Sequence, residues 1–186
     1  MTVEEIFSKL CTHMIKGLMF HQQMGMYYHF LNLEGYKCCH EYHYLSESLN
    51  HLKLQKYYIN KYNKLIPEAK FENPAVIPEA WYGVTRQDVG TTTKRTAIKD
   101  GVASWLKWEK DTCNCYNKLY QELISLEEVT AACMVKELML DVEEEIQYAE
   151  KKQLELSAVD YSLDYICQQQ EELYDKFKEK KKKLLK

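Results

Sequence analysis

The chain has 186 residues, with 25 basic and 28 acidic side chains and a formal net charge of −3. This balance provides no overall positive field that would attract nucleic acid. No apolar run reaches the roughly 18 residues needed to span a membrane, so we expect no membrane contact. The seven cysteines are odd in number and lack the spacing of a zinc knuckle, which indicates reduced thiols and a cytoplasmic protein.

Apolar side chains recur at spacings of four and three along the first third of the chain, which predicts a long amphipathic helix over 3–33. Its inward stripe consists of Leu10, Met14, Gly17, His21, Met24, Tyr28 and Leu31. His21 stands at the centre of this stripe, where a helical bundle normally has an aliphatic residue. Gly35 is expected to end this helix, and a second helix is predicted over 35–65.

The second predicted helix has two faces that can be buried, and the pattern does not determine which one points inward. One face consists of Cys38, Tyr42, Leu45, Leu49, Leu52 and Ile59. The other consists of Tyr36, His40, Glu47, His51, Leu54 and Tyr58, with His43 at its edge. Residues 66–95 hold the three prolines and predict a long crossover along a bundle, attached to its surface by Trp81 and Tyr82.

The third predicted helix begins between residues 96 and 104 and ends near Ser125. Its inward stripe is Val102, Trp105, Glu109, Thr112, Tyr116, Leu119 and Leu123. Glu109 therefore faces the core, where a carboxylate is costly unless it is paired or coordinated. Ser125 is expected to cap a fourth helix that extends to about residue 156, and Glu145 interrupts its inward stripe. A C-terminal helix over 157–186 completes the chain, so we divide it into a bundle over 1–156 and this added helix.

The heights of the polar core residues follow from the turn positions. In an antiparallel hairpin, two residues equally distant from the turn lie at the same height. A first turn at about residue 34 places His21 level with Glu47, and a turn at 126–127 places Glu109 level with Glu145. Carboxylates and imidazoles that converge in a dry bundle suit iron or manganese. His51 lies one turn from Glu47, and Asp141 lies one turn from Glu145, so each can add a ligand. The predicted metal ligands are therefore His21, Glu47, His51, Glu109, Asp141 and Glu145.

Four helices joined by a short turn, a long crossover and another short turn resemble the ferritin-like superfamily. The resemblance implies an all-α four-helix bundle with a di-metal site and an iron-oxidising or related oxygen-dependent activity. That family takes one Glu from each of two helices and a Glu-x-x-His motif from each of the other two. On the first helix the matching residue here is His21 rather than Glu.

The other positions of the motif match in part. Glu109 resembles the single Glu of the third helix, and Glu47 and Glu145 resemble the Glu of the two Glu-x-x-His motifs. Asn50 and Tyr148 stand where that family has histidine. The resemblance therefore concerns the arrangement of the helices over residues 3–156. An alternative stays open, in which the same bundle has a degenerate site and works as an oligomeric interaction or DNA-associated protein.

A second branch of the superfamily is the mini-ferritins that protect DNA in starved cells, whose iron site lies between subunits. His29 and His40, with Gly35 between them, are similar to the histidine pair of that site. This resemblance implies a homo-oligomer, and the lysine-rich end, Lys176–Lys186, resembles the tails that make nucleic-acid contacts in that branch. A plain structural bundle is the remaining alternative, and it would require Glu109 and Glu145 to pair with lysines.

Overall fold

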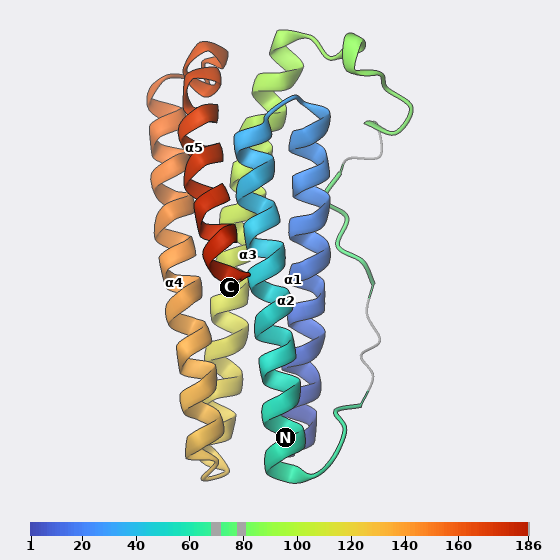
Figure 1. The fold of residues 1–186 in the computed structure, drawn as a ribbon, viewed down its shortest axis with the longest axis vertical. Coiled ribbons are helices and arrows are strands. Elements are labelled where there is room, and N and C mark those ends of the chain that lie inside the picture. The colour runs from blue at the N-terminus through green and yellow to red at the C-terminus, as the bar shows by residue number, and fades with distance from the viewer. Residues whose placement is uncertain (68–71, 78–80, 186) are drawn as a thin grey trace.

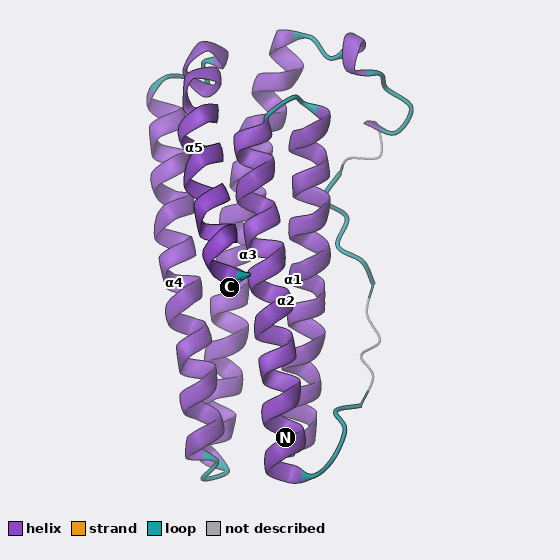
Figure 2. Cartoon of the chain, viewed as in Figure 1, coloured by secondary structure: helices purple, strands orange, loops and turns teal. Residues whose placement is uncertain are grey.

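The computed structural model describes residues 1–67, 72–77 and 81–185, and within this part of the chain it contains helices and no strand (Figures 1 and 2). The α-helices are α1 (Val3–Phe30), α2 (Glu34–Tyr62), α3 (Thr91–Ser125), α4 (Val129–Ala158) and α5 (Leu163–Leu184). A short 3₁₀ helix, η2, covers Arg86–Asp88. The all-α fold expected from the sequence is thus confirmed. Among the described residues, no helix combines the length and the apolar character that crossing a bilayer requires.

The chain path places two antiparallel hairpins side by side. Helices α1 and α2 form the first hairpin, and α3 and α4 form the second (Figure 1). The connection between α2 and α3 runs along the length of the bundle, so these two helices point in the same direction. Helix α5 then folds back beside α4 and α2 and ends near the middle of the bundle.

Local interactions explain where α1 begins and ends. The Thr2 hydroxyl accepts from the backbone N–H of Glu5 (3.2 Å), and the Glu5 carboxylate accepts from the N–H of Thr2 (2.7 Å), which satisfies two free donors at the helix start. After Phe30, Asn32 takes a left-handed conformation (φ 60°), and the N–H of Leu33 donates to the carbonyl of Tyr28 (2.9 Å). The turn is therefore centred on Asn32, two residues before the predicted position.

The turn between α3 and α4 corrects a second expectation. Ser125 is the last residue of α3, where its hydroxyl donates to the carbonyl of Glu122 (2.7 Å), so the prediction that Ser125 caps α4 was wrong. Glu127 adopts φ 61°, and the N–H of Glu128 donates to the carbonyl of Leu123 (2.9 Å). The turn remains centred close to residue 127, as predicted. Helix α3 starts at Thr91, earlier than the interval from 96 to 104.

The structure resolves which face of α2 points inward. Tyr36, His40, Leu54 and Tyr58 are buried, so the histidine-bearing face forms part of the core. On the opposite face the large apolar residues are 40–48% exposed: Leu49, Leu52 and Ile59.

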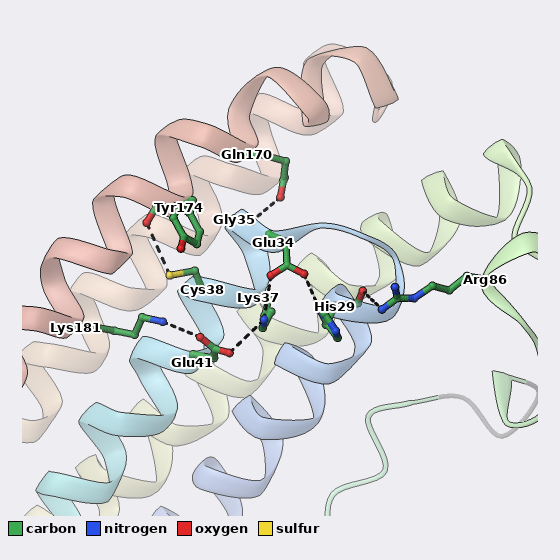
Figure 3. A network of polar contacts seen from close by, with 10 residues as sticks. All are labelled: His29, Glu34, Gly35, Lys37, Cys38, Glu41, Arg86, Gln170, Tyr174 and Lys181. Atoms are coloured by element: carbon green, nitrogen blue, oxygen red, sulfur yellow. Dashed lines mark hydrogen bonds and ion pairs between the residues drawn. The ribbon is translucent and has the colours of Figure 1, made fainter.

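The start of that outer face is covered by α5 (Figure 3). The N–H of Gly35 donates to the side-chain oxygen of Gln170 (2.7 Å), and Lys181 pairs with Glu41 (2.7 Å). A Cβ at Gly35 would lie 2.6 Å from the backbone oxygen of Gln170, so the close approach of the two helices requires glycine here. Gly35 therefore belongs to the α2–α5 contact and does not end α1.

The crossover contacts the outer side of α1. The N–H of Val76 donates to Gln23 (3.2 Å), and the Trp81 ring packs against Tyr27 with centroids 5.3 Å apart. Tyr82 is 69% exposed, so Trp81 attaches this segment and Tyr82 does not. Residues 68–71 and 78–80 of the predicted crossover, together with Lys186, lie outside the described residues.

Candidate metal centre

A layer of polar side chains separates two apolar cores inside the bundle. One core is built around Trp105, Tyr28 and Ile166, and the other around Leu10, Tyr116 and Val135. The separating layer contains the buried polar residues His21, His40, His43 and Glu109, together with the partly buried Glu145. Four helices contribute to it, because His21 lies on α1, the other two histidines on α2, Glu109 on α3 and Glu145 on α4.

Three of the predicted ligands meet in this layer. His21, Glu109 and Glu145 each offer one ligand atom, and these atoms lie within 4.8 Å of one another. Two ligands of one ion stand at most about 4.2 Å apart when each metal bond is about 2.1 Å long, so small side-chain adjustments close the site. The Glu109 carboxylate also accepts a hydrogen bond from the indole N–H of Trp105 (2.9 Å). Trp105 thus orients Glu109 as supporting residues orient metal ligands.

Two further histidines of the layer were not in the predicted central ligand set. His40 Nδ1 lies 3.0 Å from His21 Nδ1, and His43 Nδ1 lies 3.0 Å from a carboxylate oxygen of Glu145. Because the first turn is centred on Asn32, His43 rather than Glu47 is level with His21, and their ring centroids are 5.2 Å apart. The sequence signal that would have revealed this register is Asn32, since asparagine favours the left-handed conformation that ends helices.

Several imidazole nitrogens of the layer have no hydrogen-bond partner among the described residues. In the part of the chain that the structure describes, His21 Nε2, His40 Nε2 and both ring nitrogens of His43 are buried and form no hydrogen bond. His21 Nε2 lies 3.4 Å from a carboxylate oxygen of Glu109, which is close enough for an ion pair but lacks hydrogen-bond geometry. Buried polar atoms without partners are rare in proteins. Unpartnered nitrogens facing carboxylates are the arrangement that a metal ion would complete.

Burial determines the protonation of the layer. Desolvation lowers the pKa of His21 well below its usual value, and the charges of His43 and His40 add to the effect. Desolvation likewise raises the pKa of Glu109 well above its usual value, with further contributions from Glu145 and Glu47. Neutral imidazoles can bind a metal directly, whereas a carboxyl group held neutral must release its proton first.

The remaining predicted ligands lie farther from the centre. Glu47 sits one turn lower on α2, against Gly17 of α1, where an added Cβ would lie 3.3 Å from its carboxylate oxygen. Burial, followed by the charges of Glu145 and Asp141, raises the pKa of Glu47 to about 8. Glu47 does not belong to the group of ligand atoms that meet. Asp141 is exposed, and His51 is half-buried; neither belongs to the group of ligand atoms that meet.

The two histidines of the proposed inter-subunit site have different surroundings within this chain. His29 is 40% exposed and pairs with Glu34 (2.5 Å), while His40 is fully buried beside His21. The structure thus brings His40 into the central layer. It leaves His29 at the surface, where it contacts Glu34 (Figure 3). A site shared between subunits stays a prediction.

The cysteines and the lysine-rich end do not contribute to this centre. All seven cysteines are free, as expected for reduced thiols. In the lysine-rich end, Lys181 pairs with Glu41 and Lys182 with Glu179, so part of its charge is used within the chain. Nucleic-acid contact through this segment stays a prediction.

Comparisons of the chain with models of protein families, with curated proteins and with solved structures found no match. The ferritin-like resemblance therefore rests on the arrangement of the helices and on the residues of the polar layer.

Proposed function

We propose that this protein binds a transition-metal ion in the centre of its helical bundle. His21, Glu109 and Glu145 are the primary ligands, and His43 is the fourth. The observation that carries the proposal is the convergence of these side chains from four helices, with buried imidazole nitrogens that have no hydrogen-bond partner among the described residues.

The donor types favour iron or manganese. Two histidines and a carboxylate with open positions are typical of non-haem iron sites, and carboxylate oxygens suit manganese. Glu145 lies next to both His21 and His43, so its two oxygens can serve two neighbouring positions. Glu47, one turn from His43 on α2, would be the added carboxylate of a second ion.

Each protein group has a definable role in such a centre. His40 contacts His21 through Nδ1, and donation of the His21 Nδ1 proton to His40 leaves His21 Nε2 free to bind the metal. Trp105 orients Glu109 through its indole N–H. When bound, iron supplies Lewis-acid and redox chemistry, and the two apolar cores keep bulk water away from it.

We further propose that the fold is ferritin-like and that the activity is ferrous oxidation or a related oxygen-dependent reaction. The support is the chain path, with two antiparallel hairpins joined by one long crossover. The centre differs from the common di-metal motif, because α1 and α2 provide imidazoles where a symmetric carboxylate site would have glutamates.

Metal binding can be tested on the purified full-length chain. Protein stripped with chelator is dialysed anaerobically against ferrous iron and, separately, against manganese, and bound metal is measured by elemental analysis. We expect one or two ions per chain, and loss of binding in a His21→Gln variant. The matched control is His29→Gln, because His29 is a surface histidine on the same helix.

Activity is measured separately as oxygen consumption after ferrous iron is added. Absence of bound metal in the wild-type chain would contradict the proposed function. Equal metal loss in the His21 and His29 variants would show that binding occurs elsewhere. Metal binding without oxygen consumption would contradict only the oxidative activity.

A further inference from the structure

A cleft beside the polar layer offers a route to it from the surface. It has a volume of about 400 Å³ and lies between α2, α4 and α5, which run side by side in Figure 1. His43 and Glu145 line it, and both also belong to the polar layer. Small-molecule sites in proteins typically enclose about 300–1,000 Å³, so this cleft has the size of a ligand site.

The wall that α5 contributes is positively charged. Lys176 and Lys180 line the cleft, and neither forms an ion pair with a carboxylate of the described residues. Their neighbours Lys181 and Lys182 do form such pairs. The ammonium group of Lys176 lies 3.9 Å from the centroid of the Tyr148 ring, which is a cation–π contact.

The other parts of the cleft are apolar or acidic. The rings of Tyr42, Tyr148 and Phe177 line it, and the ammonium groups of Lys176 and Lys180 lie 3.9–5.5 Å from their centroids. Asp141 and Glu144 lie on the α4 side. Neither acidic residue pairs with Lys176 or Lys180 in the described structure, so an anion that enters the cleft would give these ammonium groups their carboxylate partner.

His43 connects the inner end of the cleft to the proposed metal centre. Its side chain is only 5% exposed, it lines the cleft, and neither ring nitrogen has a hydrogen-bond partner among the described residues. One nitrogen faces Glu145 at 3.0 Å. The other is available to a polar atom that enters from the cleft or to the metal.

We propose that this cleft binds a small organic carboxylate, with its anionic end at Lys176 and Lys180 and its apolar body against Tyr148 and Phe177. The opposite end of the molecule then reaches His43 and Glu145. The inference deepens the proposed function by naming a substrate class for the same centre. Binding to the lysines and the aromatic rings itself requires no metal.

The test uses the full-length chain without metal. Isothermal titration at low ionic strength measures binding of hexanoate, benzoate and inorganic phosphate. We expect saturable binding of at least one carboxylate and about 100-fold weaker binding in a Lys176→Gln/Lys180→Gln variant, since each charge-assisted contact contributes about tenfold. A Lys178→Gln/Lys182→Gln variant on the same helix is the matched control and should bind within about twofold of wild type.

Both target lysines are exposed residues, so the substitutions are expected to leave the fold intact, and circular dichroism checks this. The proposal is overturned if no carboxylate binds, if the double variant binds like wild type, or if phosphate binds as tightly as both carboxylates. Carboxylate binding without metal binding would refute the proposed function and leave this inference standing. Metal binding without carboxylate binding would refute this inference alone.

Discussion

Replacing Glu109 by glutamine tests two effects of this buried carboxylate: the destabilisation of the metal-free protein and the stabilisation by bound metal. Glu109 is 1% exposed, and its pKa is raised by burial, which shows that the protein is a poor environment for this carboxylate without a cation. Glutamine has nearly the same shape and can still accept the hydrogen bond from Trp105. The substitution therefore removes the ionisable group and keeps the packing.

We expect Glu109→Gln to raise the free energy of unfolding of the metal-free protein and to lower the part of it that bound metal contributes. Because burial keeps the Glu109 carboxyl neutral in the metal-free protein, its hydrogen bond from Trp105 is already a neutral one, and exchanging its acceptor for an amide oxygen costs at most about 1 kcal/mol. Removing a buried carboxylate that must be desolvated or protonated gains several kcal/mol. We expect the free energy of unfolding of the metal-free Glu109→Gln protein to rise by about 1–3 kcal/mol.

With metal, the same variant should lose stabilisation. A ligand at 100 times its Kd stabilises the folded state by about 2.7 kcal/mol, and a 100-fold weaker Kd reduces this to about 0.4 kcal/mol. Urea denaturation in chelator and in manganese or anaerobic ferrous iron measures both effects. The control is Glu122→Gln, because Glu122 is an exposed acidic residue on the same helix. A metal-free variant that is less stable than wild type, or one that keeps the full metal-dependent gain, would refute the reasoning.

Three other substitutions test separate parts of the structure. Gly35→Ala places a Cβ 2.6 Å from a backbone oxygen of α5, so we expect the free energy of unfolding to fall by about 1–3 kcal/mol and amide exchange in α5 to become faster. The control Gly25→Ala has no neighbour closer than 3.9 Å and should leave the amides of α5 protected. Equal exchange in the two variants would contradict the α2–α5 contact. Burial lowers the pKa of His13 to about 4 in the folded protein. As the pH drops, the unfolded state therefore binds a proton before the folded state does. We expect the free energy of unfolding to fall by up to about 3 kcal/mol between pH 6.5 and pH 4. His13→Gln should flatten this dependence in urea titrations at several pH values, and an unchanged slope would contradict it. His40→Ala should weaken metal binding about 10- to 100-fold through its contact with His21, whereas His51→Ala should leave the metal affinity unchanged in the same dialysis assay.

The sequence was sufficient to predict the register of one hairpin and not of the other. The turn after α3 was placed correctly, so Glu109 and Glu145 were expected at one height, and their ligand atoms do approach each other. The first turn was placed at about residue 34, because Gly35 was expected to end the first helix. In the structure Gly35 is helical and is required by the approach of α5, which no pattern within α1 or α2 can reveal.

The orientation of α2 also depends on a tertiary contact. Its two faces have similar apolar content, and α5 covers part of the outer one, so periodicity alone could not select the inward face. The consequence for the site was direct. The two-residue error in the turn exchanged His43 for Glu47 at the height of His21, and it left His40 outside the predicted centre.

The partners of the buried acids argue against a purely structural role for the polar layer. A structural bundle would pair Glu109 and Glu145 with lysine or arginine, which stay charged at neutral pH. Among the described residues, their ion-pair partners are instead His21 and His43, and burial keeps His21 neutral. Neither Glu109 nor Glu145 therefore has a lysine or arginine partner in the part of the chain that the structure describes. The cation of the proposed metal-bound state would supply a positive charge to both acids and would use the same imidazole nitrogens as ligands, so the proposal would account for both features with one ion.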